Sequence, residues 1–149
     1  MPGTLNLPSF DVKTRGSGQR TQILDVFRNK YVSLTPEEWV RQHVLHFLVN
    51  QHKYPQNLMA VEVALTMNGL FKRADIVVYT RSMVPWMIIE CKSSSVALDQ
   101  KVFDQAARYN LTLQVPFLLV TNGMKLFAAE INFVDQTVKR LNTVPEYTF

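Results

Sequence analysis

The chain has 149 residues, of which 47% are hydrophobic and 19% charged, and this composition is typical of one globular domain with its own core. It contains no apolar stretch of membrane-spanning length and no signal-peptide core, so we expect a cytoplasmic protein without a membrane partner. Its single cysteine, Cys91, excludes an internal disulfide, and its net charge of +4 is compatible with a nucleic-acid partner.

The first 30 residues carry five basic side chains against two acidic ones, Asp11 and Asp25. This excess fits either a basic arm on nucleic acid or a solvated segment. Residues 1–20 contain Pro, Gly, Ser and Thr and are predicted to be irregular, with one short strand near residues 10–12. Residues 22–28 fit a short helix or a short strand.

The first clear helix is predicted to begin after Thr35 and to end near Asn50. Thr35 is a good N-cap, Pro36 suits the first helical position, and Glu38 stands where a capping box requires an acid. Apolar residues then recur at helical spacing and form one stripe, made of Val40, Val44, Leu45, Phe47 and Leu48.

Three antiparallel strands are predicted next, over residues 61–67, 71–79 and 86–92. The first strand alternates apolar and polar side chains, which places one face in the core. Asn68 and Gly69 then form a strong two-residue hairpin turn.

A second helix is predicted over residues 98–111, followed by an apolar strand over 116–120. A strand, a helix and a strand in this order suggest a right-handed crossover with parallel pairing. Further strands are expected over residues 125–131 and 134–141. The order α-β-β-β-α-β predicts an α/β fold in which a mixed sheet is flanked by helices.

Two acids stand next to the apolar runs of neighbouring strands, Asp75 before one run and Glu90 after the other. Glu90 and Lys92 are two apart, so they share a face, and Asp75 can join them across the sheet. Two carboxylates and an ammonium group at one point predict a Mg²⁺ site for phosphodiester hydrolysis, in which Mn²⁺ would substitute. The carbonyl oxygen of Cys91 is a third candidate ligand, and Lys92 would orient the attacking water or stabilise negative charge.

A structural alternative is a buried ion pair between Asp75 and Lys92, with Glu90 solvated. That arrangement leaves Glu90 beside the pair without a partner, which is costly. The thiol of Cys91 should point away from Glu90 into the core, which argues against a nucleophile. Zinc is rejected because no Cys or close acid completes a tetrahedral site for the three histidines, His43, His46 and His52.

A motif now emerges from Asp75, the tripeptide that begins at Glu90, and the segment from Gln105 to Tyr109. These residues resemble the PD-(D/E)XK nuclease superfamily, and more narrowly the N-terminal nuclease domain of type I restriction enzyme R subunits. The resemblance covers roughly residues 30–130 and implies a restriction-endonuclease-like core. One departure is Ala74, which stands where the superfamily name has a proline.

The resemblance implies a role for each matching residue. Asp75 and Glu90 would bind the metal, and Lys92 would be the catalytic lysine. Glu38 would complete the metal shell. Its alternative, purely structural role is that of the acid in the capping box. Gln105 and Tyr109 would support the site or contact DNA, although both also fit a plain polar helix face.

Three basic side chains are further candidates for contact with nucleic acid, namely Arg73, Lys101 and Arg108. Arg73 shares a strand face with Asp75, so a salt bridge to Asp75 or to Glu62 across the hairpin is an alternative. Lys101 and Arg108 lie on the second predicted helix, where solvent exposure explains them equally well.

The sequence therefore predicts that residues 1–149 form one domain, a Mg²⁺-dependent nuclease that acts on DNA with low sequence preference. The chain has no Gly-x-x-x-x-Gly-Lys-Ser/Thr phosphate loop, so we expect a separately encoded motor or specificity subunit, or a homodimer. The alternative is a non-catalytic module that binds nucleic acid or assembles a restriction or repair system. DNA against RNA, single against double strand, and endonuclease against exonuclease all stay open.

Overall fold

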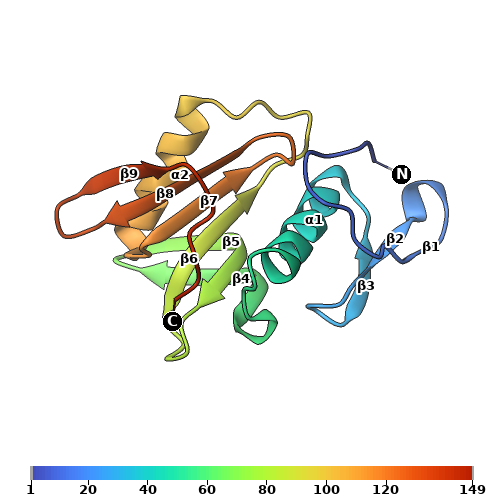
Figure 1. Ribbon diagram of the computed structural model, residues 1–149, viewed down its shortest axis with the longest axis horizontal. Coiled ribbons are helices and arrows are strands. Elements are labelled where there is room, and N and C mark those ends of the chain that lie inside the picture. The colour runs from blue at the N-terminus through green and yellow to red at the C-terminus, as the bar shows by residue number, and fades with distance from the viewer. Residues whose placement is uncertain (1, 149) are drawn as a thin grey trace.

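The computed structural model describes residues 2–148, which form two β-sheets and two α-helices (Figure 1). The small sheet is antiparallel and consists of β1 (Thr14–Arg15), β2 (Gln22–Asp25) and β3 (Lys30–Ser33). The large sheet has the spatial order β4 (Met59–Met67), β5 (Leu70–Tyr79), β6 (Pro85–Cys91), β7 (Phe117–Thr121), β8 (Leu126–Asn132) and β9 (Thr137–Leu141). Short 3₁₀ turns occupy Gly18–Arg20 and Gln56–Leu58.

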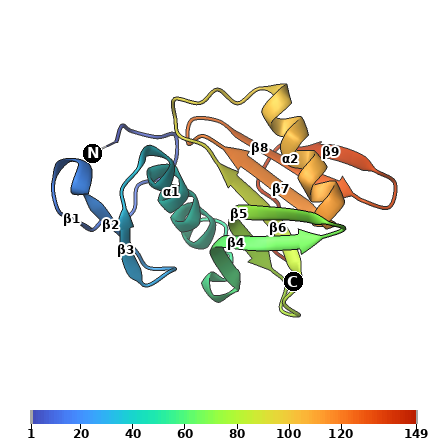
Figure 2. The ribbon, with the colours of Figure 1, turned by 180° about the vertical axis from the view of Figure 1, so that it is seen from behind.

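The two helices, α1 (Pro36–Asn50) and α2 (Gln100–Leu113), pack on opposite faces of the large sheet (Figures 1 and 2). Met87 and Ile89 of β6 join the core under α1, whereas Ile88 between them packs on the α2 side. Successive residues of a strand point to opposite faces, so the helices cover different faces. Neither helix of the described chain is both long and apolar enough to cross a membrane.

Pairing within the large sheet is mixed, as predicted. Strands β6 and β7 are parallel and are connected through α2, while the other neighbouring pairs are antiparallel. The element order from α1 onward begins α-β-β-β-α-β, so the predicted mixed sheet flanked by helices is confirmed.

Local sequence explains the start of α1 and the first hairpin of the large sheet. The side chain of Thr35 accepts a hydrogen bond of 3.0 Å from the Glu38 amide, which confirms the N-cap. The second hydrogen bond of the predicted capping box, from the Thr35 amide to the Glu38 carboxylate, is wrong. The Thr35 amide donates to the Ser33 carbonyl, and the Glu38 carboxylate accepts from Arg28 and Arg41. Asn68 and Gly69 both adopt positive φ, as a two-residue hairpin turn requires.

The N-terminal region differs from the prediction in its strands. The short strand expected near residues 10–12 is wrong, because within the described chain these residues pair with no strand, and Phe10 stacks on His46 of α1. The first strand is instead β1, and residues 22–28 resolve into β2 and a turn. β3 lacks an alternating pattern and was not predicted from the sequence.

Two boundaries after residue 98 shift by two or three positions. Asp99 caps α2 by accepting a 2.9 Å hydrogen bond from the amide of Val102, so the helix begins later than predicted. The strand expected over residues 134–141 begins only at Thr137. The side chain of Asn132 accepts hydrogen bonds from Val134 and Asp135 and holds the preceding residues in a turn.

Candidate metal centre

Asp75 lies where the ladder between β5 and β6 stops. The last paired residues before it are Ile76 and Ile89, and the Asp75 carboxylate then accepts a 2.8 Å hydrogen bond from the backbone amide of Cys91. This bond replaces a main-chain acceptor at the end of the ladder. It fixes Asp75 against the segment that carries Glu90.

Glu90 points to the opposite side of β6 from Cys91, into a cavity of about 130 Å³ between the sheet and α2. The cavity is lined by Lys72, Glu90, Lys92, Val102, Gln105, Ala106, Tyr109 and Val120. The predicted common face of Glu90 and Lys92 is therefore what the structure has, and Gln105 and Tyr109 border the same space. The thiol of Cys91 is buried in the core under α1, and burial raises its pKa well above the usual value.

The Glu90 carboxylate is buried and incompletely paired. Its Oε1 lies 3.2 Å from Nζ of Lys72 and forms an ion pair with it. The geometry of a hydrogen bond is not met, so Oε1 has no hydrogen bond among the described residues. Burial raises the pKa of Glu90, and the negative charge of Asp75 raises it further, while Lys72 and Lys92 oppose the rise. When Glu90 is ionised, its charge is thus only partly compensated by its surroundings.

Lys72 is a member of this cavity that the sequence analysis did not select. Its ammonium lies 4.8 Å from the centroid of the Tyr109 ring, in cation–π geometry, while it pairs with Glu90. Tyr109 therefore supports the partner of Glu90 from α2. Nothing in the strand pattern around Lys72 distinguishes it from a solvated lysine.

Arg41 of α1 holds the other side of Asp75. Its Nη2 donates a 2.9 Å hydrogen bond to Asp75 Oδ1, and its guanidinium also pairs with three glutamates, Glu37, Glu38 and Glu62. Burial acts to lower the pKa of Arg41, but the hydrogen bond to Asp75 and the charges of Glu38 and Asp75 outweigh it and raise that pKa. Arg41 therefore stays charged at any pH at which the fold exists.

The two acids of the first turn of α1 have different surroundings. Glu38 is buried, and its carboxylate accepts hydrogen bonds of 2.7 Å from both Arg28 and Arg41. Glu37 is half exposed and contacts only Arg41. Desolvation and the charge of Asp75 raise the pKa of Glu37, while Arg41 and Lys92 act to lower it. The charges of Asp75 and Lys92 therefore both act on Glu37.

Arg28 extends this network to the small sheet. It pairs with the fully buried Asp25 through a 2.5 Å contact, with Glu38, and with Glu62 at 3.5 Å. We call these residues the arginine–acid network: Asp25, Arg28, Glu37, Glu38, Arg41, Glu62 and Asp75. All members of the network except Asp25 and Asp75 line a groove of about 790 Å³ between the small sheet, the start of α1 and Glu62.

Glu62 carries backbone strain directly opposite Asp75. The pairs Val61–Ile76 and Val63–Ala74 flank this position, and Glu62 itself adopts a φ of 53°. A left-handed conformation costs a residue with a side chain about 1–2 kcal/mol. The ion pairs of Glu62 with Arg28 and Arg41 help to hold it there.

The predicted contacts to nucleic acid are scattered. Arg73 is exposed and pairs with Glu62 at 3.4 Å, as the hairpin alternative predicted, and not with Asp75. Arg108 is exposed beside Gln105 and Tyr109 at a separate surface cavity. Lys101 is exposed on α2 and lines neither the Glu90 cavity nor the groove.

The residues fit a magnesium ion in part. Within residues 2–148 no three His, Cys, Asp or Glu side chains converge as metal ligands, so a metal between Asp75 and Glu90 would need backbone and water oxygens as well. Mg²⁺ is bound in that way, with few carboxylates and several waters. The oxygen Oε1 of Glu90 accepts no hydrogen bond, and each Asp75 oxygen keeps a second lone pair beyond the bond it accepts.

One sequence signal could have identified Arg41. It stands on the buried side of α1 between Val40 and Val44, where a solvated arginine is out of place, and it follows Glu37 by four residues. A buried charge requires a partner, so this position predicted an acid on a neighbouring element.

A known protein family matches most of the chain. The model of the family described as type I restriction enzyme R protein N terminus matches residues 36–145, most of the chain. The matched range begins with α1 and contains Asp75, Glu90 and Lys92, whereas the small sheet precedes it. No curated protein matches the chain.

Proposed function

The chain belongs to the type I restriction enzyme R protein N-terminus family, and on that premise we propose that it is a Mg²⁺-dependent nuclease that hydrolyses DNA phosphodiester bonds. The observation that carries the proposal is the junction at which the Asp75 carboxylate, from within β5, binds the end of β6 next to Glu90 and Lys92, which line one cavity. Within that junction, Glu90 presents a buried oxygen without a hydrogen bond. The resemblance to type I restriction R subunits, seen first in the motif, is confirmed by the family match over residues 36–145.

Asp75 and Glu90 would hold the metal, with the Cys91 carbonyl as a further ligand, and Mn²⁺ would substitute for Mg²⁺. When bound, the ion supplies Lewis-acid stabilisation of the phosphoryl oxygens and lowers the pKa of water. The protein contributes the positions of the ligands. Asp75 is fixed by the Cys91 amide at 2.8 Å and by Arg41 at 2.9 Å, so its carboxylate is oriented before any ligand arrives.

Charge balance supports a cation at this place. The two arginines of the network, Arg28 and Arg41, face five carboxylates, and Arg73 reaches only Glu62. Glu90 adds a sixth acid close to Asp75, and Lys72 and Lys92 act on it, so six carboxylates face five cationic side chains once Arg73 is included. A divalent cation would remove this excess.

Lys92 would act on the water or on the phosphate. It lines the cavity together with Glu90 and Gln105, so its ammonium can orient a nucleophile or stabilise the charge that develops on the phosphoryl group. Gln105 would hold water by hydrogen bonds, and Tyr109 positions Lys72 beside Glu90. Glu38 is the candidate for an outer acid, although Glu37 has the more open carboxylate.

The family's description supplies the expected partners. A restriction R protein operates with other subunits on DNA, so we propose DNA as the substrate and a motor or specificity subunit as partner, with a homodimer as the alternative assembly. The exposed Arg108, which lines a separate surface cavity with Gln105 and Tyr109, and the exposed Lys101 would contact phosphates along α2.

A cleavage assay tests the proposal. Purified protein is incubated with plasmid and with linear single-stranded DNA, in Mg²⁺, in Mn²⁺ and in EDTA. We expect metal-dependent cleavage, and a loss of about 10²–10³-fold in rate for Lys92→Ala, the loss typical when a charge-stabilising group is removed.

Lys139→Ala on β9 is the matched control, because it removes the same charge from an exposed strand at the far edge of the sheet. Equal cleavage by Lys92→Ala and Lys139→Ala would show that the site is wrongly assigned. If the protein neither cleaves DNA nor binds Mg²⁺ in calorimetry, the non-catalytic binding module becomes the better description.

A further inference from the structure

The small sheet is a separate wall of the groove whose floor includes Arg41, the partner of Asp75. It precedes the residues that match the family, and it contributes Gln22, Lys30, Tyr31, Val32 and Ser33 to the groove lining. The start of α1 and Ser93, the residue after Lys92, lie along the same groove. A strand that follows the groove would therefore pass the small sheet and reach Arg41 and Ser93, which are neighbours of the candidate metal centre.

Arg15 lies on β1, at the edge of the small sheet, and its guanidinium is fixed by neutral side chains without an acidic partner among the described residues. Its guanidinium carbon lies 4.1 Å from the centroid of the Tyr31 ring, and its Nε donates a 2.7 Å hydrogen bond to Oε1 of Gln22. Both supports are neutral, and within residues 2–148 no acid lies at ion-pair distance from Arg15. The terminal N–H groups of a fixed, uncompensated guanidinium suit a phosphate group.

Lys30 adds a second uncompensated charge on the same wall. It is exposed, lines the groove, and makes no ion pair within the described residues. Its strand neighbour Asp25 directs its carboxylate to Arg28. Arg15 and Lys30 are therefore cationic side chains of the small sheet itself, whereas the acids of the network that line the groove lie on its floor, where they pair with Arg28 and Arg41.

We propose that the small sheet is a phosphate-binding wall that guides a DNA strand along the groove toward Asp75, through Arg15 and Lys30. The chemistry is recognition of the polyanionic backbone, independent of base sequence. This inference rests on the proposed nuclease function for its direction. It concerns binding alone, and so it is testable when the metal is absent.

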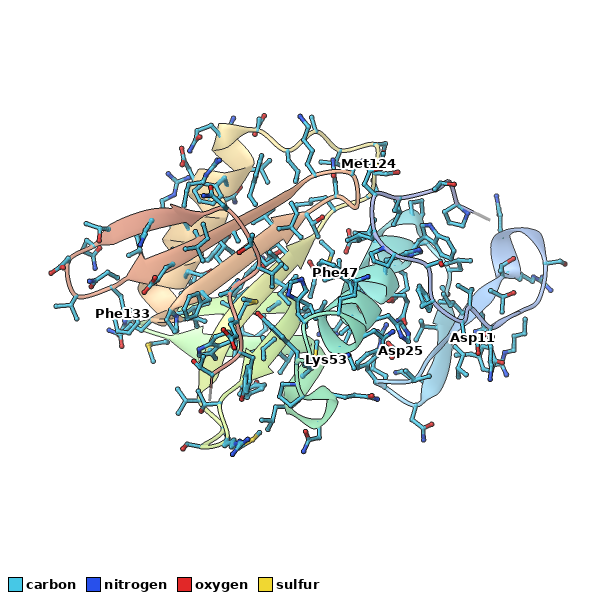
Figure 3. The ribbon with its side chains drawn as sticks, in the orientation of Figure 1. Asp11, Asp25, Phe47, Lys53, Met124 and Phe133 are labelled. Atoms are coloured by element: carbon cyan, nitrogen blue, oxygen red, sulfur yellow. The ribbon has the colours of Figure 1, made fainter. Side chains whose placement is uncertain are left out.

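Fluorescence anisotropy in EDTA measures the affinity for a short single-stranded oligonucleotide and for the matching duplex, at several salt concentrations between about 50 and 200 mM. The test variant is Arg15→Ala with Lys30→Ala, and both side chains are exposed, so the fold is retained. The matched control is Lys53→Ala with Lys139→Ala, which removes the same charge. Lys53 follows the far end of α1, and Lys139 lies on β9, at the side of the molecule where Phe133 marks the turn (Figure 3).

For whichever DNA the wild type binds more tightly, we expect the test variant to lose about tenfold in affinity. We also expect its salt slope to become shallower by about 1.4–1.8, the value for two phosphate contacts. The control should keep the wild-type affinity and slope. Equal behaviour of test variant and control, or no DNA binding by the wild type, would overturn the inference.

Failure here is distinguishable from failure of the nuclease. A protein that cleaves DNA through Lys92 but binds it equally well without Arg15 and Lys30 keeps its proposed function and loses only the guiding wall. A protein that binds DNA through the wall in EDTA but never cleaves it loses the proposed function and keeps the wall.

Discussion

Asp25 and Glu90 are two buried carboxylates in one small protein, and their pKa values shift in opposite directions. Burial acts to raise the pKa of Asp25, but hydrogen bonds from the backbone and side chain of Arg28 outweigh it and lower that pKa. For Glu90, burial prevails and the pKa rises. The difference lies in what each carboxylate accepts.

Asp25 is nearly saturated with donors. It accepts hydrogen bonds from the amides of Phe27 and Arg28, at 2.7 and 2.9 Å, and from the Arg28 side chain. The oxygen Oε1 of Glu90 is buried, forms an ion pair with Lys72, and has no hydrogen bond among the described residues. Both acids have a cationic partner, but only Asp25 also accepts backbone hydrogen bonds. A carboxylate in the state of Glu90 is suited to accept a cation, whereas Asp25 is suited to connect the small sheet with α1.

The largest expected effect on stability comes from removing the Asp25 carboxylate. Asp25→Ala removes the partner of Arg28 beside the buried Glu38, and removal of one member of a buried ion pair costs about 3–5 kcal/mol. Urea denaturation followed by circular dichroism measures the loss in unfolding free energy.

The matched control is Asp11→Ala, because Asp11 is largely exposed and its contact with Lys13 is 3.9 Å long. We expect its unfolding midpoint to equal that of the wild type. If Asp25→Ala were as stable as Asp11→Ala, the network would not connect the small sheet to α1 energetically.

Glu90→Gln should have the opposite sign at neutral pH. It removes a charge that the fold buries without full compensation, so we expect a stability gain of about 0.5–2 kcal/mol, as for other substitutions that relieve a functional site. Mg²⁺ should stabilise the wild type against heat, because a ligand of the native state raises its melting temperature, and it should not stabilise the variant. A wild type indifferent to Mg²⁺ in this assay would contradict the metal assignment.

The pH dependence of the two acids separates them further. Because the folded pKa of Glu90 is raised, its ionisation penalty is absent below the usual value of 4.5 and grows as pH rises through the folded pKa. The advantage of Glu90→Gln should therefore appear only on raising the pH from that region.

Asp25 behaves in reverse. Because its folded pKa is lowered, its contribution to stability is present above the usual value of 3.8 and is lost as pH falls through the folded pKa. Unfolding free energies of wild type, Glu90→Gln and Asp25→Ala at a series of pH values test both signs. A Glu90→Gln advantage that is constant over pH would exclude ionisation as its cause.

Which of these features the sequence could predict follows from the range of the interactions. The large sheet, both helices and the common face of Glu90 and Lys92 depend on hydrophobic periodicity and strand alternation, which are local patterns. Asp75 was found because its spacing to Glu90 matches a motif. β3 and β1 were missed because the small sheet is short and partly exposed, so its strands show little alternation.

The partners of the acids were not predictable in the same way. Glu37 and Glu38 are neighbours in one helical turn, and only the packing of α1 beside β4 and β5 decides which is buried between arginines. Lys72 reaches Glu90 because α2 places Tyr109 over it, a contact between elements far apart in the chain. Pattern rules identify which residues are unusual, while tertiary packing decides with which residues they pair.

The smallest expected effect concerns Arg73, whose side chain is 64% exposed and pairs with Glu62 at 3.4 Å. Exposed pairs contribute about 0.2–1 kcal/mol, because water screens the charges and the side chains lose mobility. Arg73→Ala should therefore cost less than about 0.5 kcal/mol in urea denaturation, far below Asp25→Ala. A cost of several kcal/mol would instead mean that the strained backbone of Glu62 depends on Arg73 as well as on Arg28 and Arg41. The exposed Arg73 of β5 would then belong to the arginine–acid network.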